Sequence, residues 1–242
     1  MTAETPPLAG PPPSPDEGQA LPVDDPRAAQ ILATEHWSLL AGRSLAYNET
    51  FSRAGMFLTF LSASLIVVGF LVASDRFADA VIPIVILLLA VNLYVGLATL
   101  GRIVDANIEE LTAVRGMTRI RHAYTEMIPG IQRYFTASIH DDREGIATAY
   151  SGGRPRRRSS FLHGLTTMGG MVASINCVLF AALASVIAIG LGTTLGLALG
   201  LGVGAFFAGF IGFNAWGYRT VTRTSLFDDP MFPSPPDEPP ET

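Results

Sequence analysis

The chain has 242 residues, a formal net charge of -5, 49% hydrophobic residues and 15% charged residues. Soluble domains carry about 25% charged residues. Charge is missing from four apolar blocks, which excludes one large water-soluble core and indicates membrane spans. Cys177 is the only cysteine, which excludes an intrachain disulfide and Cys-x-x-Cys metal sites. We expect it to be a small apolar residue of the core.

The N-terminal part divides into a tail and a helix. Residues 1–24 are rich in proline, glycine and acids, which predicts a disordered tail. Asp25 as N-cap and Pro26 at the first helical position then predict a helix over residues 25–54. This segment is amphipathic, so we expect a cytoplasmic helix that runs directly into the first span.

The first two apolar spans are predicted at residues 55–73 and 80–100. At 1.5 Å rise per residue, about 20 residues cross about 30 Å of hydrocarbon. Asn92 is the strongly polar residue deep in the second span. Such a residue usually bridges helices, which contributes about 0.6 to 2 kcal/mol. A substrate contact is the alternative interpretation.

Residues 101–138 continue as an amphipathic helix outside the membrane. Apolar residues recur there at steps of three and four, which predicts a stalk with one apolar stripe. We expect the stripe to pack on residues 25–54 or on the same stalk of another subunit. Pro129 and Gly130 predict a break or kink.

A linker at residues 139–167 contains the nearest approach to a chemical cluster. His140, Asp141, Asp142 and Glu144 could hold a divalent ion. Their spacing matches no known ligand loop, so a solvated loop or helix cap is favoured over a metal site. No cofactor is predicted.

The same linker ends in arginines that precede the third span. Arginines beside a membrane attract anionic lipid headgroups, with about 1 kcal/mol each. Aromatic residues are not interleaved among them, so lipid is the expected partner and no nucleic acid is expected. These candidate lipid contacts are Arg154, Arg156, Arg157 and Arg158.

The third and fourth spans are predicted at residues 168–191 and 194–216, followed by a disordered tail at residues 225–242. Asn176 in the third span parallels Asn92 as a predicted interhelical residue. The fourth span carries a glycine seam, a small residue at every fourth position, which is typical of closely packed helices. The seam consists of Gly192, Gly196, Gly200, Gly204, Ala208 and Gly212.

The seam predicts how the fourth span packs. A four-residue step turns a helix by about 400°, so the seam drifts by about 40° per step. One straight neighbour cannot follow it throughout. We therefore expect two neighbours, one near residues 192–200 and another near residues 204–212. The fourth span would then be the central helix of the bundle.

Basic residues predict the orientation of the chain. Of the sixteen basic residues, all of them arginine, only Arg76 falls in a predicted hairpin loop. The positive-inside rule then predicts both termini and the central segment in the cytoplasm, in the inner cell membrane. The predicted fold class is an all-α polytopic membrane protein, with four transmembrane helices as two hairpins and cytoplasmic helical extensions.

Two stretches carry a resemblance to a known group of proteins. They are HWSLLAGRSLAYNETFSRAGMFL and GLATLGRIVDANIEELTAVRGMTRIRHAYTEMIPGIQRYF, with HDD soon after. Together they resemble an uncharacterised family of four-span integral membrane proteins from GC-rich bacteria. The resemblance covers residues 30–220 and implies an integral membrane protein. It supplies no activity and no functional residues.

The sequence favours a structural or interaction protein, not an enzyme. Such a protein would form a homo-oligomer or bind another membrane or cytoplasmic protein through the glycine seam and the cytoplasmic helices. The alternative is an oligomeric channel or pore-forming effector, gated by dewetting of small apolar residues. The four spans contain no ionisable acid or base of the kind that ion-coupled transport requires, which disfavours a coupled transporter.

Overall fold

The computed structural model describes residues 26–73, 78–151, 167–224 and 227–235. Within these residues it contains helices and no strands. Four of the helices are long and apolar enough to cross a membrane, which confirms the predicted all-α, four-span fold. The chain is therefore a multi-pass integral membrane protein. The helices are α1 (Pro26–Ala73), α2 (Ala78–Met127), the short 3-10 helix η2 (Ile131–Tyr134), α3 (Arg143–Ser151), α5 (Met168–Gly190) and α6 (Leu195–Thr222).

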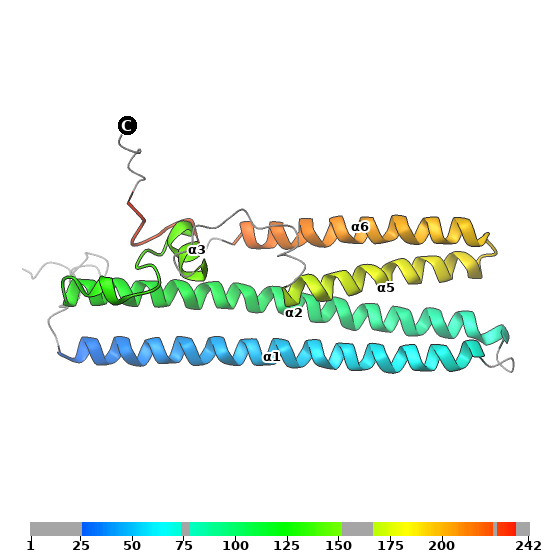
Figure 1. The fold of residues 1–242 in the computed structure, drawn as a ribbon, viewed down its shortest axis with the longest axis horizontal. Helices are drawn as coiled ribbons and strands as arrows, with labels where there is room; N and C mark the ends of the chain where they lie inside the picture. The colour runs from blue at the N-terminus through cyan, green and yellow to red at the C-terminus, as the bar shows by residue number, and fades with distance from the viewer. Residues whose placement is uncertain (1–25, 74–77, 152–166, 225–226, 236–242) are drawn as a thin grey trace, which may run out of the picture.

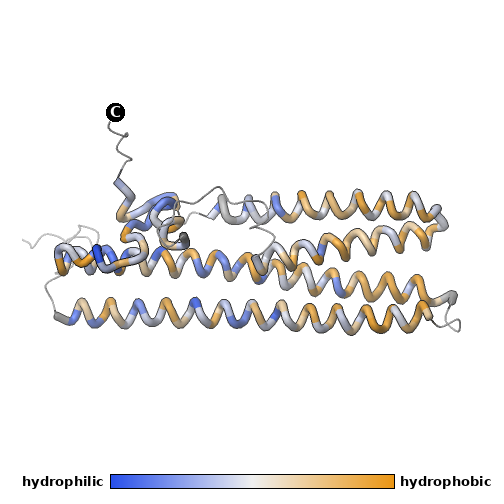
Figure 2. Tube along the Cα trace, viewed as in Figure 1, coloured by the Kyte–Doolittle hydropathy of each residue, from blue (hydrophilic) through white to orange (hydrophobic). Residues whose placement is uncertain are grey.

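The long helices lie side by side in the order α1, α2, α5, α6 (Figure 1). α1 and α2 pack along each other, whereas the shorter hairpin of α5 and α6 lies beside only one half of α2. Hydrophobic residues dominate that half of the row, and hydrophilic residues gather in the other half of α1 and α2 (Figure 2). The shared apolar half is the part that crosses the membrane.

The helix boundaries refine the predicted segments. α1 joins the predicted segments 25–54 and 55–73 without a break. α2 likewise runs out of its span, but it ends at Met127 and not at residue 138. Pro129 follows its end, and Gly130 has a left-handed φ of 85° that reverses the chain into η2. α3 lies inside the predicted linker 139–167, so that linker is partly helical.

α2, not α6, is the central helix of the row. A buried cluster that includes Phe57, Leu89, Ile103 and Val172 joins α1, α2 and α5. α6 packs extensively on α5 alone, at the edge of the row. The prediction that the fourth span is central is therefore wrong.

The direction in which the glycine seam faces explains why α6 is not the central helix. Gly192 lies in the turn after α5, where its left-handed φ of 82° ends that helix. A Cβ atom added at Gly196, Gly200, Gly204 or Gly212 would meet nothing within 4 Å. The seam therefore faces away from the rest of the described chain. Only at its end do Ala208 and Gly212 border a cavity of about 650 Å³ between α6 and α2.

Glycines off the seam make the close contact with α5. A Cβ at Gly202 would overlap the Ser185 hydroxyl and lie 3.0 Å from the carbonyl oxygen of Ala181. Gly209 is also close, since its Cβ would lie 3.7 Å from Sγ of Cys177. Two residues turn a helix by about 200°, so Gly202 lies opposite Gly200 and Gly204.

The two buried asparagines hydrogen-bond within their own helices. The Asn92 amide donates to the Leu88 carbonyl at 2.8 Å, and the Asn176 amide donates to the Val172 carbonyl at 2.9 Å. A Cβ at Gly96 would overlap Oδ1 of Asn176, so this glycine lets α5 approach α2. The interhelical contact that the sequence predicts for Asn176 is present as packing and not as a hydrogen bond.

Candidate docking site on the polar stalk

The polar stalk consists of residues 27–54 of α1 and 101–127 of α2, which extend beyond the apolar half of the row. The two stripes pack on each other, as the sequence predicts. Gly116 permits a close approach, because a Cβ there would lie 2.8 Å from Cδ1 of Leu39. The stalk therefore forms a platform on which loops can be held.

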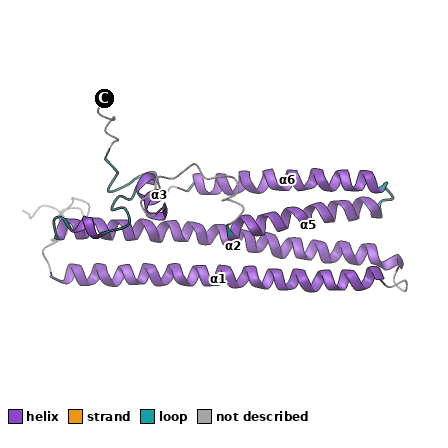
Figure 3. Cartoon of the chain, in the orientation of Figure 1, coloured by secondary structure: helices purple, strands orange, loops and turns teal. Residues whose placement is uncertain are grey.

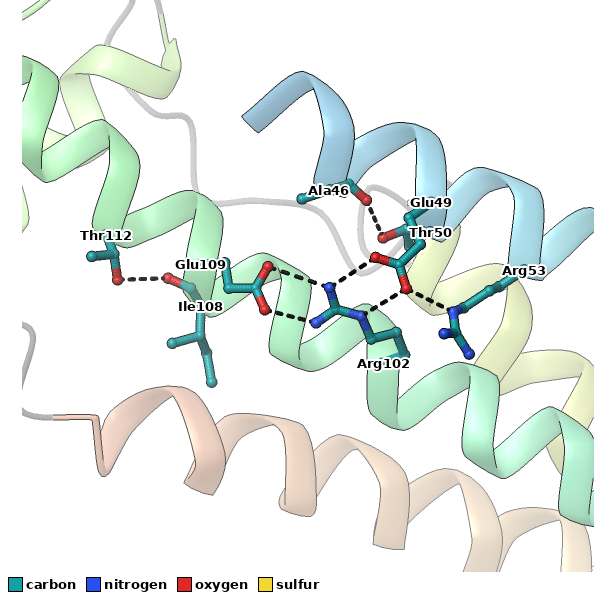
Figure 4. A network of polar contacts seen from close by, with 8 residues as sticks. All are labelled: Ala46, Glu49, Thr50, Arg53, Arg102, Ile108, Glu109 and Thr112. Atoms are coloured by element: carbon teal, nitrogen blue, oxygen red, sulfur yellow. Dashed lines mark hydrogen bonds and ion pairs between the residues drawn. The ribbon is translucent and has the colours of Figure 1, made fainter. Parts of the chain in front are cut away.

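A cluster of three ion pairs lies on the stalk, and one of them, Arg102–Glu49, joins the two stalk helices. Arg102 donates to Glu49 at 3.1 Å and to Glu109 at 2.7 Å, and Arg53 donates to Glu49 at 2.9 Å (Figure 4). The hydrogen bond from Arg102, and then that from Arg53, lowers the pKa of Glu49. These side chains are exposed, so their contribution to stability is small. Their effect is to hold the alignment of the helices.

Another ion pair of the stalk lies beside α3. Arg43 donates to Glu110 at 2.6 Å, and its guanidinium lies 5.9 Å from the ring centre of Tyr150. Burial, and next the charge of Glu110, raises the pKa of Tyr150 to about 12. Arg43 and Glu110 also line an open cavity of about 570 Å³ between α1, α2 and the start of α5. Because they are paired with each other, they offer that cavity little net charge.

The most specific polar arrangement surrounds Asp141. Its side chain is fully buried and accepts Nε–H of Arg119 at 2.7 Å and of Arg115 at 3.3 Å. It also accepts the backbone N–H of Phe232 at 2.8 Å and of Met231 at 3.2 Å. The Asp141 N–H donates in return to the Phe232 carbonyl at 3.1 Å. Asp141 therefore ties α2 to the segment that follows α6.

Asp142 extends the same contact and begins α3. It accepts the N–H of Gly145 at 2.8 Å, which caps the helix. It also accepts the N–H of Ser234 at 3.0 Å and the Ser234 hydroxyl at 2.9 Å. The helix-cap interpretation is confirmed for Asp142, whereas the solvated loop is wrong for the buried Asp141. No group of three or more His, Cys, Asp or Glu side chains in the described ranges could hold a metal ion.

An aromatic contact completes the arrangement. The ring of Phe232 stacks on His122 of α2, with ring centres 3.7 Å apart and planes at 17°. Arg115 also donates to the carbonyl oxygen of Asp229. We call the surface formed by Arg115, Arg119, His122, Asp141 and Asp142 the docking site, and residues 229–234 its occupant.

The occupant belongs to a segment that the sequence assigns to a disordered tail. Residues 227–235 are instead held beside α3 and α2 by the docking site (Figure 1). Contacts from distant parts of the chain thus order a stretch whose own composition favours disorder. The remainder of this predicted tail, at residues 225–226 and 236–242, and the whole predicted tail at residues 1–24 lie outside the described residues.

The charge of Asp141 is stabilised by its donors. Burial by itself raises the pKa of this carboxyl, but the backbone N–H groups of Phe232 and Met231 and the Arg119 guanidinium lower it to about 2. The same opposition lowers the pKa of Asp142, where the N–H groups of Ser234 and Gly145 outweigh burial. Both carboxyls are therefore ionised near neutral pH, as acceptors of hydrogen bonds and not as proton donors.

Comparison with known proteins found no matching family model, no similar curated protein and no similar solved structure. The function of the chain is therefore inferred from its own residues. In the docking site, the charged groups bond to each other and to the backbone of residues 229–234. The candidate lipid contacts at Arg154, Arg156, Arg157 and Arg158 lie outside the described residues and stay a prediction.

The sequence did not point to Arg115, Arg119, His122, Phe232 or Ser234 as parts of one site. Two signals could have found them. Arg115 and Arg119 are four residues apart and so share one face of a helix. Met231 and Phe232 are an apolar pair inside a segment of prolines and acids, which is unusual for a solvated tail.

Acid should release the occupant from the docking site. The Asp141 carboxyl has a pKa of about 2 in the folded protein and about 3.9 when unfolded. Its stabilising contribution is complete above the unfolded value and is lost as pH falls through the folded value. A spin label at the exposed Met231 (Met231→Cys with Cys177→Ala) should stay immobile down to about pH 4 and become mobile toward about pH 2. A label that is already mobile at pH 7 would contradict the docking.

Proposed function

We propose that this chain is a non-enzymatic membrane protein that assembles with copies of itself through the outer face of α6. The observation that carries the proposal is the direction of the glycine seam. Cβ atoms at Gly196, Gly200 and Gly204 would meet nothing within 4 Å, although these residues belong to a membrane-crossing helix. The seam therefore offers a backbone surface that the monomer leaves uncovered.

Such a face suits close helix association in a membrane. Without side chains at every fourth position, two backbones can approach, and packing and weak hydrogen bonds favour the pair. A pair of this type crosses at about -40° and stays close over two or three repeats. Gly196, Gly200 and Gly204 provide that length. The same face on two copies gives a self-complementary contact with twofold symmetry.

The stalk adds a second surface outside the apolar spans. Trp37, Tyr47 and Phe51 are 70%, 63% and 64% exposed, and their spacing places them on one face of α1. Exposed aromatic residues in water are typical of protein contact surfaces. We propose that this face contacts a second copy or a cytoplasmic protein. The arginines on the stalk side favour a cytoplasmic location for it, in the inner membrane.

Oligomeric state tests the proposal. Wild-type protein in mild detergent should have the mass of a dimer or larger assembly by light scattering. The double variant Gly200→Leu/Gly204→Leu should be monomeric and keep the hydrogen-exchange protection of the α5–α6 hairpin, since its new side chains project away from α5. A wild-type monomer in both detergent and lipid nanodiscs would contradict self-assembly. Discrete conductance steps in liposomes would instead favour the pore alternative.

A further inference from the structure

We propose that the docking site is a peptide-binding site and that residues 229–234 are its tethered, displaceable ligand. The partner it fits is a short peptide that bends at an aromatic residue and carries the residue types of Pro230, Phe232, Pro233 and Ser234. In the structure the protein's own C-terminal segment takes this place. The proposal concerns a surface on the stalk and does not depend on assembly through α6.

Recognition of the occupant is mostly recognition of its backbone. Asp141 binds the N–H groups of Met231 and Phe232, and Arg115 binds the carbonyl of Asp229. Such backbone contacts are available to a peptide that bends at these two positions, so that consecutive N–H groups point to the same side. Two side chains then supply selectivity, namely Phe232 on His122 and the Ser234 hydroxyl on Asp142.

The occupant is built to be exchanged at low entropic cost. Pro230 and Pro233 fix φ at two positions of the occupant before binding, so less conformational freedom is lost on docking. The side chain of Met231 is 63% exposed, and Pro233 and Pro235 are also exposed, so one face of the segment is open to solvent. Residues 229–234 lie outside the chain's α-helices. A short segment outside the helices can open locally at a free energy below that of global unfolding.

After release of residues 229–234, the docking site would bind another peptide. Release of residues 229–234 leaves the buried carboxylate of Asp141 without two of its backbone donors, while Arg115 and Arg119 hold it in place. A buried acceptor without its donors is costly. An incoming peptide with N–H groups in the same spacing restores these bonds. Asp142 remains in position to accept a hydrogen bond from a serine hydroxyl, and the His122 ring remains in position to stack on an aromatic side chain.

Binding of a synthetic peptide to the full-length protein tests this inference. The probe is a fluorescein-labelled peptide with the sequence of residues 228–235, DDPMFPSP. The variants Phe232→Ala and Ser234→Pro weaken the tethered ligand without changing the docking site. Both should bind the probe at least about tenfold more tightly than wild type, because a tethered segment competes at an effective concentration in the millimolar range. Fluorescence anisotropy in detergent measures the affinities.

Two controls make the outcome decisive. A probe with alanine in place of its phenylalanine should bind at least about tenfold more weakly. Adding Asp141→Asn to the Phe232→Ala variant should abolish binding. Equal affinity of wild type and both variants, or no binding by either variant, would overturn the proposal. Hydrogen exchange that shows the amides of residues 231 and 232 still protected in both variants would also overturn it, because the segment would then be fixed structure. Repeating the titration with Gly200→Leu/Gly204→Leu added separates this result from self-assembly.

Discussion

Replacing Asp141 by asparagine should release residues 229–234 and destabilise the polar stalk by about 3 to 5 kcal/mol. The carboxylate is fully buried and accepts hydrogen bonds from Arg115, Arg119 and two backbone N–H groups. An amide has one acceptor oxygen and adds donors where donors already converge. It therefore leaves arginine charge without its anionic partner.

Hydrogen exchange and thermal melting of the full-length protein measure this effect. The backbone amides of Met231, Phe232 and Ser234 should lose their protection in the Asp141→Asn variant. Glu109→Gln is the matched control, since Glu109 also pairs with an arginine of α2 but is 53% exposed. It should cost at most about 1 kcal/mol. If the two substitutions lower the free energy of unfolding equally, the burial of Asp141 does not increase its contribution to stability.

The second large effect is expected at Gly202. Leucine at this position would place a side chain against Ser185 and the backbone of Ala181, which cannot move without shifting α5. Overpacking of this kind costs about 1 to 3 kcal/mol and more where the backbone must move. The melting temperature in detergent should therefore fall by several degrees, and the α5–α6 hairpin should lose protection from hydrogen exchange.

Gly200→Leu is the matched control for Gly202→Leu. The two glycines are two residues apart in the same helix, yet a Cβ at Gly200 meets nothing within 4 Å. Its substitution should leave the stability of the monomer unchanged. If Gly200→Leu removes the hydrogen-exchange protection of the α5–α6 hairpin as Gly202→Leu does, the rotation of α6 described above is wrong.

The contrast between these glycines shows what the sequence can predict. The lengths of the apolar blocks predict the four spans, and Pro26 and Pro129 mark the start of α1 and the region where α2 ends. The four-residue repeat predicts a face that allows close approach. The repeat does not predict which helix packs on this face, because that depends on the rotation of α6 against α5. In this chain Gly202, which lies outside the repeat, makes the close contact with α5, and the glycines of the repeat face outward.

The docking site lay beyond prediction for a different reason. Its parts come from residues far apart in the chain, and each has an ordinary local interpretation. From the sequence alone, Asp141 is interpreted as an acidic residue in a loop. Phe232 is interpreted as part of a solvated tail. Only the turn at Gly130 and the end of α6 bring them to the same stretch of α2. Long-range geometry of this kind leaves no periodic signal in the sequence.

The most direct test of self-assembly through α6 is disulfide crosslinking in native membranes. A single cysteine is placed at Gly204 or at Leu199 in a Cys177→Ala background. Both positions belong to the part of α6 that crosses the membrane, but Leu199 is turned about 140° away from Gly204. Mild oxidation should crosslink two copies through Gly204→Cys and not through Leu199→Cys. Equal crosslinking at both positions, or none at Gly204→Cys, would contradict assembly through the seam.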